Sequence, residues 1–276
     1  MLENAFRPLN ADGDAAARRL YLCGIFRVGE PMKSRHALRH PSKTMNPDSE
    51  TIGEDFLDFK CPYCTALNSF PAHAAGHVRE CMNCVETFLV PVTDSEPARP
   101  LPLPLETEKL RLRRFEPTDW QDLLEFRFND EDDATGWLLT ATKARLSEAN
   151  QTLHLAVAAR DTGKVVGALS LRFTDIDYNQ AELSLESAKP GPFAGFELEA
   201  LDAAFDFGFR DLHLHRILGW CSGEQTEICN LFRGAGMRQE AEFVKDTFVN
   251  GAWKTTLSFA LLEEEYFKEA GDKKTS

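Results

Sequence analysis

The chain has 276 residues, of which 43% are hydrophobic and 27% charged, a composition typical of a globular protein with one or two domains. Its formal net charge of −13 argues against nucleic acid as a partner, because an acidic surface repels the phosphate backbone. No apolar run approaches the roughly 18 residues of a membrane span, and the N-terminus lacks the order of a secretory signal, so we predict a cytoplasmic protein without a membrane partner.

Residues 1–50 show neither helical nor strand periodicity, and we predict that they form a disordered tail. Residues 1–44 hold eight basic and four acidic side chains, in contrast to the acidic remainder of the chain. Two interpretations stay open. Either this segment is a genuine tail, or Met45 is the true start and residues 1–44 are not translated.

Residues 51–92 contain two Cys-x-x-Cys pairs, Cys61/Cys64 and Cys81/Cys84, with 16 residues between them. Each pair can fold as a tight knuckle that presents two thiolates, and two knuckles complete a tetrahedral zinc site. Apolar and β-forming runs flank both pairs, which predicts short hairpins. A module of about 37 residues cannot bury a stable core, so the metal must supply much of its folding energy. The alternative, a pair of redox dithiols, lacks the surrounding βαβ pattern.

The module resembles bacterial zinc ribbons of the CPxC…CxxC…F-x-V-P kind. It departs from them at Thr65 and Val85, where a glycine often follows each knuckle. Four cysteines leave no open position on the metal, so we predict a structural rather than a catalytic zinc. An excess of acidic residues in the module argues for structural support or docking of a protein partner, and against nucleic-acid binding.

Residues 93–105 form a proline-containing linker that we expect to be extended and semi-rigid. Residues 106–268 then form one α/β domain, followed by a tail at 269–276. Apolar periodicity and turn signals predict the elements of this domain. The predicted strands lie at 109–113, 153–160, 165–173, 181–186, 216–222 and 257–262. One helix is predicted to begin at Thr118 or Asp119, and two further helices are predicted at 194–211 and 225–234. A hairpin turn is predicted at Asn250–Gly251.

Five stretches of this domain resemble, in order, the GNAT superfamily of N-acetyltransferases, in particular ribosomal-protein N-terminal acetyltransferases of the Rim type. They are LETEKLRLRRFEPTDW, DTGKVVGALSL, HRILGWC, GAGMRQEAEF and FVNGAWKTTLSFALLEEEY, and the resemblance covers about 160 residues. It implies a GNAT fold, in which helices flank a mixed, mainly antiparallel central sheet, here preceded by a small β zinc ribbon.

The resemblance also implies acetyl-CoA as the co-substrate, gripped at its pyrophosphate by the loop between a strand and the long helix. Glu182 and Gly195 are 13 positions apart, as in the family, so the loop residues carry over without a gap. Phe193 falls on the first loop glycine and Ala194 on the loop lysine, which puts a ring near the phosphates and removes a cation. The implied cofactor-binding residues of this loop and of the following helix are Phe193, Ala194, Gly195, Phe196 and Gln225, the last in place of an asparagine.

Acetyl transfer to an amine needs a base for the ammonium proton and an N–H donor for the thioester oxygen. The resemblance places that donor in the backbone of Leu183, Ser184 and Leu185. Glu182 is the first candidate for the base and Glu186 a weaker one; the alternative for Glu182 is a carboxylate held in a salt bridge. We interpret the other candidate side chains as packing or surface residues, namely His154, His213, His215 and Cys221. Residues 125–137 lie where the family binds its acceptor, although a solvated loop is the simpler interpretation.

Two functions remain open at this point. The first is an acetyl-CoA-dependent N-acetyltransferase that acts on the primary amine of a protein N-terminus or a small molecule. The second is an inactive domain of the same fold that binds a protein partner with the help of the ribbon.

Overall fold

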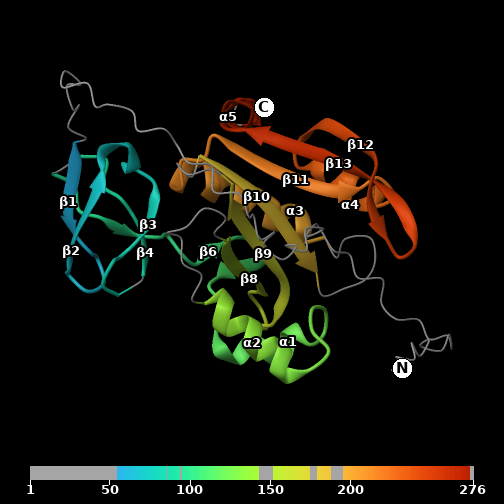
Figure 1. Cartoon of the computed structure of the whole chain (residues 1–276), viewed down its shortest axis with the longest axis horizontal. Helices are drawn as coiled ribbons and strands as arrows, with labels where there is room; N and C mark the ends of the chain where they lie inside the picture. Colours follow the sequence, from blue (N-terminus) through green and yellow to red (C-terminus); the bar gives the residue numbers. More distant parts are fainter. Residues whose placement is uncertain are drawn as a thin grey trace, which may run out of the picture.

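The computed structural model describes residues 55–84, 86–93, 95–142, 152–174, 179–187 and 195–273. A small module of short strands lies beside a domain built on one long sheet (Figure 1). The tail predicted at residues 1–50 lies outside the described residues. None of the described helices combines the length and apolar character that crossing a bilayer would require.

The N-terminal module consists of two small antiparallel sheets. Strand β1 (Phe56–Lys60) pairs with β2 (Leu67–Pro71), and a short 3-10 helix, η1 (Ala72–Ala74), follows. Strand β3 (Val78–Glu80) pairs with β4 (Thr87–Leu89), so each Cys-x-x-Cys pair lies between the two strands of a hairpin. The short hairpins predicted from the sequence are present. Three phenylalanine rings form most of the module's own core, with centroids 5.5–6.3 Å apart: Phe59, Phe70 and Phe88.

The proline-containing segment is bound at both ends. Strand β5 (Arg99–Pro100) pairs with β4 of the module, and β6 (Leu105–Glu106) pairs with β7 of the large sheet. Residues 93–105 therefore do more than span the distance between two domains. They add one short strand to the sheet on each side.

The large sheet has the strand order β12-β13-β11-β10-β9-β8-β7-β6. Neighbouring strands run antiparallel except β10 and β11, which are parallel. Its remaining strands are β7 (Leu110–Arg113), β8 (Thr152–Ala159), β9 (Val165–Phe173), β10 (Gln180–Ser187), β11 (Arg216–Ser222), β12 (Arg238–Val249) and β13 (Ala252–Leu262). Asn250 and Gly251 both have positive φ angles, 50° and 79°, which confirms the tight turn predicted between the last two strands.

Helices cover both faces of this sheet (Figure 1). They are η2 (Pro117–Asp119), α1 (Trp120–Leu123), α2 (Glu131–Ala141), α3 (Glu197–Asp206), a π-helical turn η3 (Phe207–Asp211), α4 (Thr226–Gly234) and α5 (Glu263–Lys273). The prediction of a solvated loop at 125–137 is wrong for the second half of that segment, where α2 begins. The Asp130 side chain accepts a hydrogen bond from the Asp133 N–H at 2.8 Å and so caps that helix.

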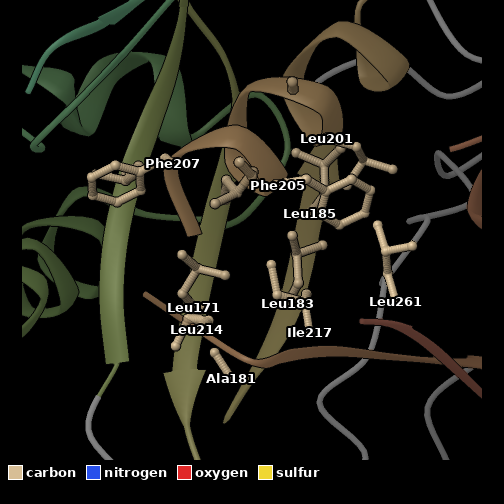
Figure 2. Packing of buried hydrophobic residues seen from close by; sticks show 14 of the residues in the cluster. Leu171, Ala181, Leu183, Leu185, Leu201, Phe205, Phe207, Leu214, Ile217 and Leu261 are labelled. Carbon is tan, nitrogen blue, oxygen red and sulfur yellow. The ribbon is translucent and has the colours of Figure 1, made fainter. Parts of the chain in front are cut away.

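Alternation along the central strands separates an apolar face from a polar one. Ala181, Leu183 and Leu185 of β10 are fully buried against α3, whereas the residues between them are half-buried and polar. Figure 2 shows leucines of β9 and β10 packed beneath Leu201 and Phe205 of α3. This alternation leaves polar side chains of β10 on the face opposite α3.

The module and the large sheet share one core. Val78 and Leu89 of the module are 2% and 6% exposed, and both belong to the same buried cluster as the leucines of β7 to β10. Arg114, which follows β7, donates a hydrogen bond to the Thr87 hydroxyl. A methyl group added to Gly76 would come within 3.1 Å of the His213 ring. The module is thus packed as a part of the domain.

We expect Leu89→Ala to lower the free energy of unfolding of the whole domain by about 2–4 kcal/mol, because it opens a cavity in the shared core. Leu67→Ala is the matched control, since Leu67 lies in the same module but is 69% exposed. Urea unfolding followed by tryptophan fluorescence measures the effect, because all tryptophans lie outside the module. A fluorescence transition unchanged by Leu89→Ala would show that the two parts do not share a core.

Candidate functional site

An opening in the large sheet begins where β10 and β11 separate. The two strands pair over three residues each, from Gln180 to Glu182 and from Arg216 to Leu218. In the described residues no pairing between them follows, although β10 stays paired with β9 as far as Ser187. The predicted oxygen-binding strand, Leu183–Leu185, thus borders the opening with one edge. Of these three residues Leu183 and Leu185 are fully buried, and Ser184 is half-buried.

The start of α3 lies at one end of this opening. Gly195 has a φ angle of +85°, and an added methyl group would meet no atom within 4 Å, so its conformation rather than space favours glycine. Phe196 is only 9% exposed, and a Cβ atom added at Gly167 would lie 3.7 Å from its ring. It is therefore a packing residue in the described structure. Phe193 and Ala194 lie outside the described residues.

Helix α4 begins at the other side of the opening. The Gln225 side-chain oxygen accepts a hydrogen bond from the Ser222 N–H at 2.9 Å, which closes the turn between β11 and α4. Phe232 is 1% exposed and lies against Gly219, where an added methyl group would come within 2.8 Å of its ring. Gln225 holds the local backbone in place, and Phe232 belongs to the core.

A row of polar side chains crosses the three central strands on the face opposite α3. Glu182 lies opposite Arg172 in the register of β10 and β9, and the two side chains form an ion pair. In the next row, the hydroxyls of Ser170 and Ser184 are 2.5 Å apart. The salt-bridge alternative for Glu182 is therefore present in the structure.

Arg127 joins this face from the segment between α1 and α2. Its guanidinium forms an ion pair with Glu186 at 2.5 Å and lies 4.3 Å from the centre of the Trp137 ring. His154 also contacts Trp137, with ring centres 5.1 Å apart. Burial, together with the positive charge of Arg127, lowers the pKa of His154 to about 4, so its imidazole is neutral near pH 7.

Sequence reasoning missed Arg127, Arg172 and Ser170. A signal for the last two exists, because alternation along β9 places both on the same face as Glu182. It becomes specific only once the register of β9 and β10 is known. No periodic signal marks Arg127, which lies between two helices.

A cavity of about 720 Å³ lies on the outer side of α3, between the helix and residues 102–108. Six carboxylate residues contribute to its lining: Glu106, Glu108, Glu199, Asp202, Asp206 and Asp211. This charge has the wrong sign for the phosphates of a nucleotide cofactor. The opening between β10 and β11, rather than this cavity, is the candidate active site.

The four ribbon cysteines converge on one point. Their Sγ atoms all lie within 4.8 Å of one another, with 3.7 Å between Cys61 and Cys84 and 3.6 Å between Cys64 and Cys81. A tetrahedral ion with metal–sulfur bonds of about 2.3 Å requires sulfur–sulfur separations of about 3.8 Å, so the site fits zinc in size. Four groups donate hydrogen bonds to these sulfurs: the N–H groups of Tyr63 and Asn83 and the side chains of Asn68 and Asn83. The Met82 N–H donates in turn to the side-chain oxygen of Asn68.

Without a cation these thiols do not ionise together. Burial opposes ionisation of Cys81, but the backbone N–H groups of Cys84 and Asn83 lower its pKa to about 6. The backbone of Glu86 favours ionisation of Cys84, yet burial and the neighbouring thiols raise its pKa to about 12. Four negative sulfurs at this spacing repel one another, and a divalent cation removes that cost.

Residues 109–238 match the family model described as acetyltransferase (GNAT) domain, which supports an acyltransferase enzyme. The predicted acetyltransferase domain at 106–268 encloses the match.

Two curated relatives are similar to this domain. The uncharacterized N-acetyltransferase YnaD of Bacillus subtilis (strain 168) is 24% identical over 174 residues, which cover 59% of this chain and 98% of the relative. A spermidine N(1)-acetyltransferase of Vibrio cholerae is 23% identical over 106 residues, 38% of this chain and 61% of the relative. Both carry the name of an N-acetyltransferase, which supports the enzyme class.

Solved structures support the fold. An acetyltransferase of the GNAT family from Bacillus anthracis superposes with a TM-score of 0.51 at 23% identity, over 59% of this chain and 99% of the other. A putative ribosomal-protein-serine acetyltransferase from Vibrio cholerae has a TM-score of 0.50 at 20% identity, over 59% and 98% of the two chains. The mixed, mainly antiparallel sheet predicted from the sequence is confirmed.

Proposed function

We propose that this protein transfers an acetyl group from acetyl-CoA to a primary amine of a protein N-terminus or a small molecule, with a structural zinc ion in its ribbon. The separation of β10 from β11 after Glu182 carries this proposal. An edge of β10 that borders an opening can bind the pantetheine arm and place an N–H group at the thioester oxygen. Backbone atoms of Leu183, Ser184 and Leu185 are the donors and acceptors we assign to this role.

The pyrophosphate would lie at the start of α3, where the conformation of Gly195 allows close approach of the backbone. Phe193, Ala194 and Phe196 complete this loop in the proposal, and Gln225 supports the opposite wall. Glu197, which is 2% exposed, and Glu199 lie in the first turn of α3 and add negative charge there. This charge and the phenylalanine at 193 favour the second candidate, an inactive domain that binds a protein partner.

The amine nitrogen would attack the thioester carbon, the CoA sulfur would leave, and the ammonium proton would pass to a base. Glu182 is the base in this proposal, with a water molecule between the carboxylate and the amine. Arg172 forms an ion pair with Glu182, and Ser184 lies next on the same face. The acceptor would approach from this polar face, near Arg127 and Trp137.

The subgroup and the acceptor belong to the same proposal. Resemblance to the Rim-type enzymes favours a protein N-terminus, and the spermidine-acetylating relative favours a small amine. Four cysteines in reduced form fit a cytoplasmic location, in which thiols persist and bind zinc. The ribbon then supports the domain and offers a surface for a protein partner.

The first test is calorimetric titration of the zinc-loaded protein with acetyl-CoA. We expect binding in the micromolar range, and tighter binding by Phe193→Gly if the ring obstructs the phosphates. Adding Ala194→Lys should tighten it again, because a cation returns to the site. Absence of binding at millimolar acetyl-CoA, with a folded protein, would favour the inactive alternative.

Glu182→Gln tests the proposed base in a steady-state assay of CoA release with peptide and polyamine acceptors. We expect kcat to fall by about 10²–10⁴-fold with little change in the affinity for acetyl-CoA, because only proton transfer is lost. Glu186→Gln is the matched control, since it removes the other ion-paired carboxylate of β10. Equal rates for Glu182→Gln and the wild type would rule out this role.

Metal content and thermal unfolding test the zinc site. We expect one zinc ion per chain by elemental analysis, and a lower melting temperature of the whole domain after chelation, because Val78 and Leu89 anchor the ribbon in the shared core. Cys81→Ser should lose the metal and the response to chelator. A metal-free protein with the melting temperature of the untreated one would contradict the proposal.

A further inference from the structure

Two cysteines outside the ribbon lie in contact beside the active-site opening. Cys221 is near the end of β11 and Cys229 lies in α4, and their Sγ atoms are 2.9 Å apart. Both side chains are buried, with 3% and 2% of their surface exposed. The sequence predicted only a small buried residue at Cys221 and gave no role to Cys229.

This spacing differs from that of the metal-binding cysteines in the same chain. Contacts between neighbouring knuckles of the ribbon measure 3.6 and 3.7 Å, which a bridging zinc ion explains. Cys221 and Cys229 are closer than that, while a disulfide bond measures about 2.05 Å. Among the described residues, the ribbon supplies the one group of three or more side chains that could hold a metal. The pair is therefore spaced for a sulfur–sulfur bond rather than for a shared ion.

Local hydrogen bonds hold both cysteines where they are. The turn between them is closed by the Gln225 N–H, which donates to the Ser222 carbonyl at 2.8 Å, and by the Gln225 side chain on the Ser222 N–H. The Cys229 N–H donates to the Gln225 carbonyl at 3.1 Å. On the other side, Cys221 lies opposite Leu257 in the ladder of β11 and β13. A bond between the sulfurs needs a shift of about 1 Å, which side-chain rotation can supply.

We propose that Cys221 and Cys229 are a redox modification site that forms a reversible intramolecular disulfide with a peroxide as the oxidant. One thiol attacks a peroxide oxygen, which gives a sulfenic acid and one water molecule. The second thiol then attacks that sulfur, and the hydroxyl leaves as a second water molecule. Two thiols are oxidised, one peroxide is reduced, and reduction by a dithiol reverses the change.

The burial of both sulfurs determines which oxidant can react. Burial slows the reaction of both thiols and excludes a bulky disulfide reagent, so we assign the oxidation to hydrogen peroxide, which is close to water in size. The product would tie α4 to β11, the strand that borders the opening opposite β10. This inference does not depend on acetyl transfer, because it concerns the bond between two elements of the fold.

Mass spectrometry of the intact, zinc-loaded chain tests the proposal. Trypsin releases residues 217–233 as one peptide, which contains both cysteines and no others. The protein is treated with hydrogen peroxide, unfolded, alkylated and digested. We then expect this peptide to carry no alkyl group and to be lighter than its dithiol form by the mass of two hydrogen atoms. A protease specific for glutamate cuts between the cysteines, and the two fragments should stay linked until a reductant is added.

Cys229→Ser is the control variant and should show no loss of two hydrogens. In reduced samples, the peptide of residues 20–27, which contains Cys23, reports whether alkylation is complete. The wild-type measurement stands even if the variant does not fold. Full alkylation of residues 217–233 after peroxide treatment would overturn the proposal, and so would sulfinic acid at either position in place of the disulfide.

Discussion

The opening between β10 and β11 depends on a parallel pair within a sheet whose other described neighbours are antiparallel. A parallel connection needs a long crossover, and here α3 supplies it. The helix packs over the leucines of β9 and β10, so its bulk lies against one face of the sheet while its first turn lies at the end of β10. The polar face of β10 stays clear of α3. Strand direction thus separates the proposed cofactor side of the site from the proposed acceptor side.

The ribbon contributes to the packing of the large domain. Its strands β3 and β4 contribute Val78 and Leu89 to the core of the large domain, and β5 and β6 fix the connecting segment at both ends. A ribbon that only docked a partner would need neither contact. The buried leucine and valine link the hairpin that carries Cys81 and Cys84 to the packing of β7 and β8, on the apolar face that α3 also covers. Structural support therefore accounts for the ribbon without a partner, and its exposed surface remains available for one.

Much of this architecture could be predicted because local signals agree with it. Alternation predicted β8 to β11 within a residue or two, and the Asn250–Gly251 turn fixed the last hairpin. The helix α2 was missed because its first turn, Glu131 to Asp133, is acidic and resembles a solvated loop, although Asp130 caps it. Of the ion pair on the polar face, Glu182 was singled out from the sequence but its partner Arg172 was not. That pairing depends on strand register, which one sequence does not reveal.

Charge on the acceptor face separates this domain from a simple polyamine site. Glu182 and Glu186, the two acids of β10 on that face, are each paired with an arginine of the same chain. A doubly charged amine would have to displace a guanidinium or approach beside it, which costs Coulomb energy, more at Arg127, whose side chain is 23% exposed, than at Arg172, which is 39% exposed. An acceptor with one amine and no second cation nearby meets no such penalty. If the proposed acetyl transfer takes place at this face, the paired charges would favour the amine of a peptide N-terminus over that of a polyamine.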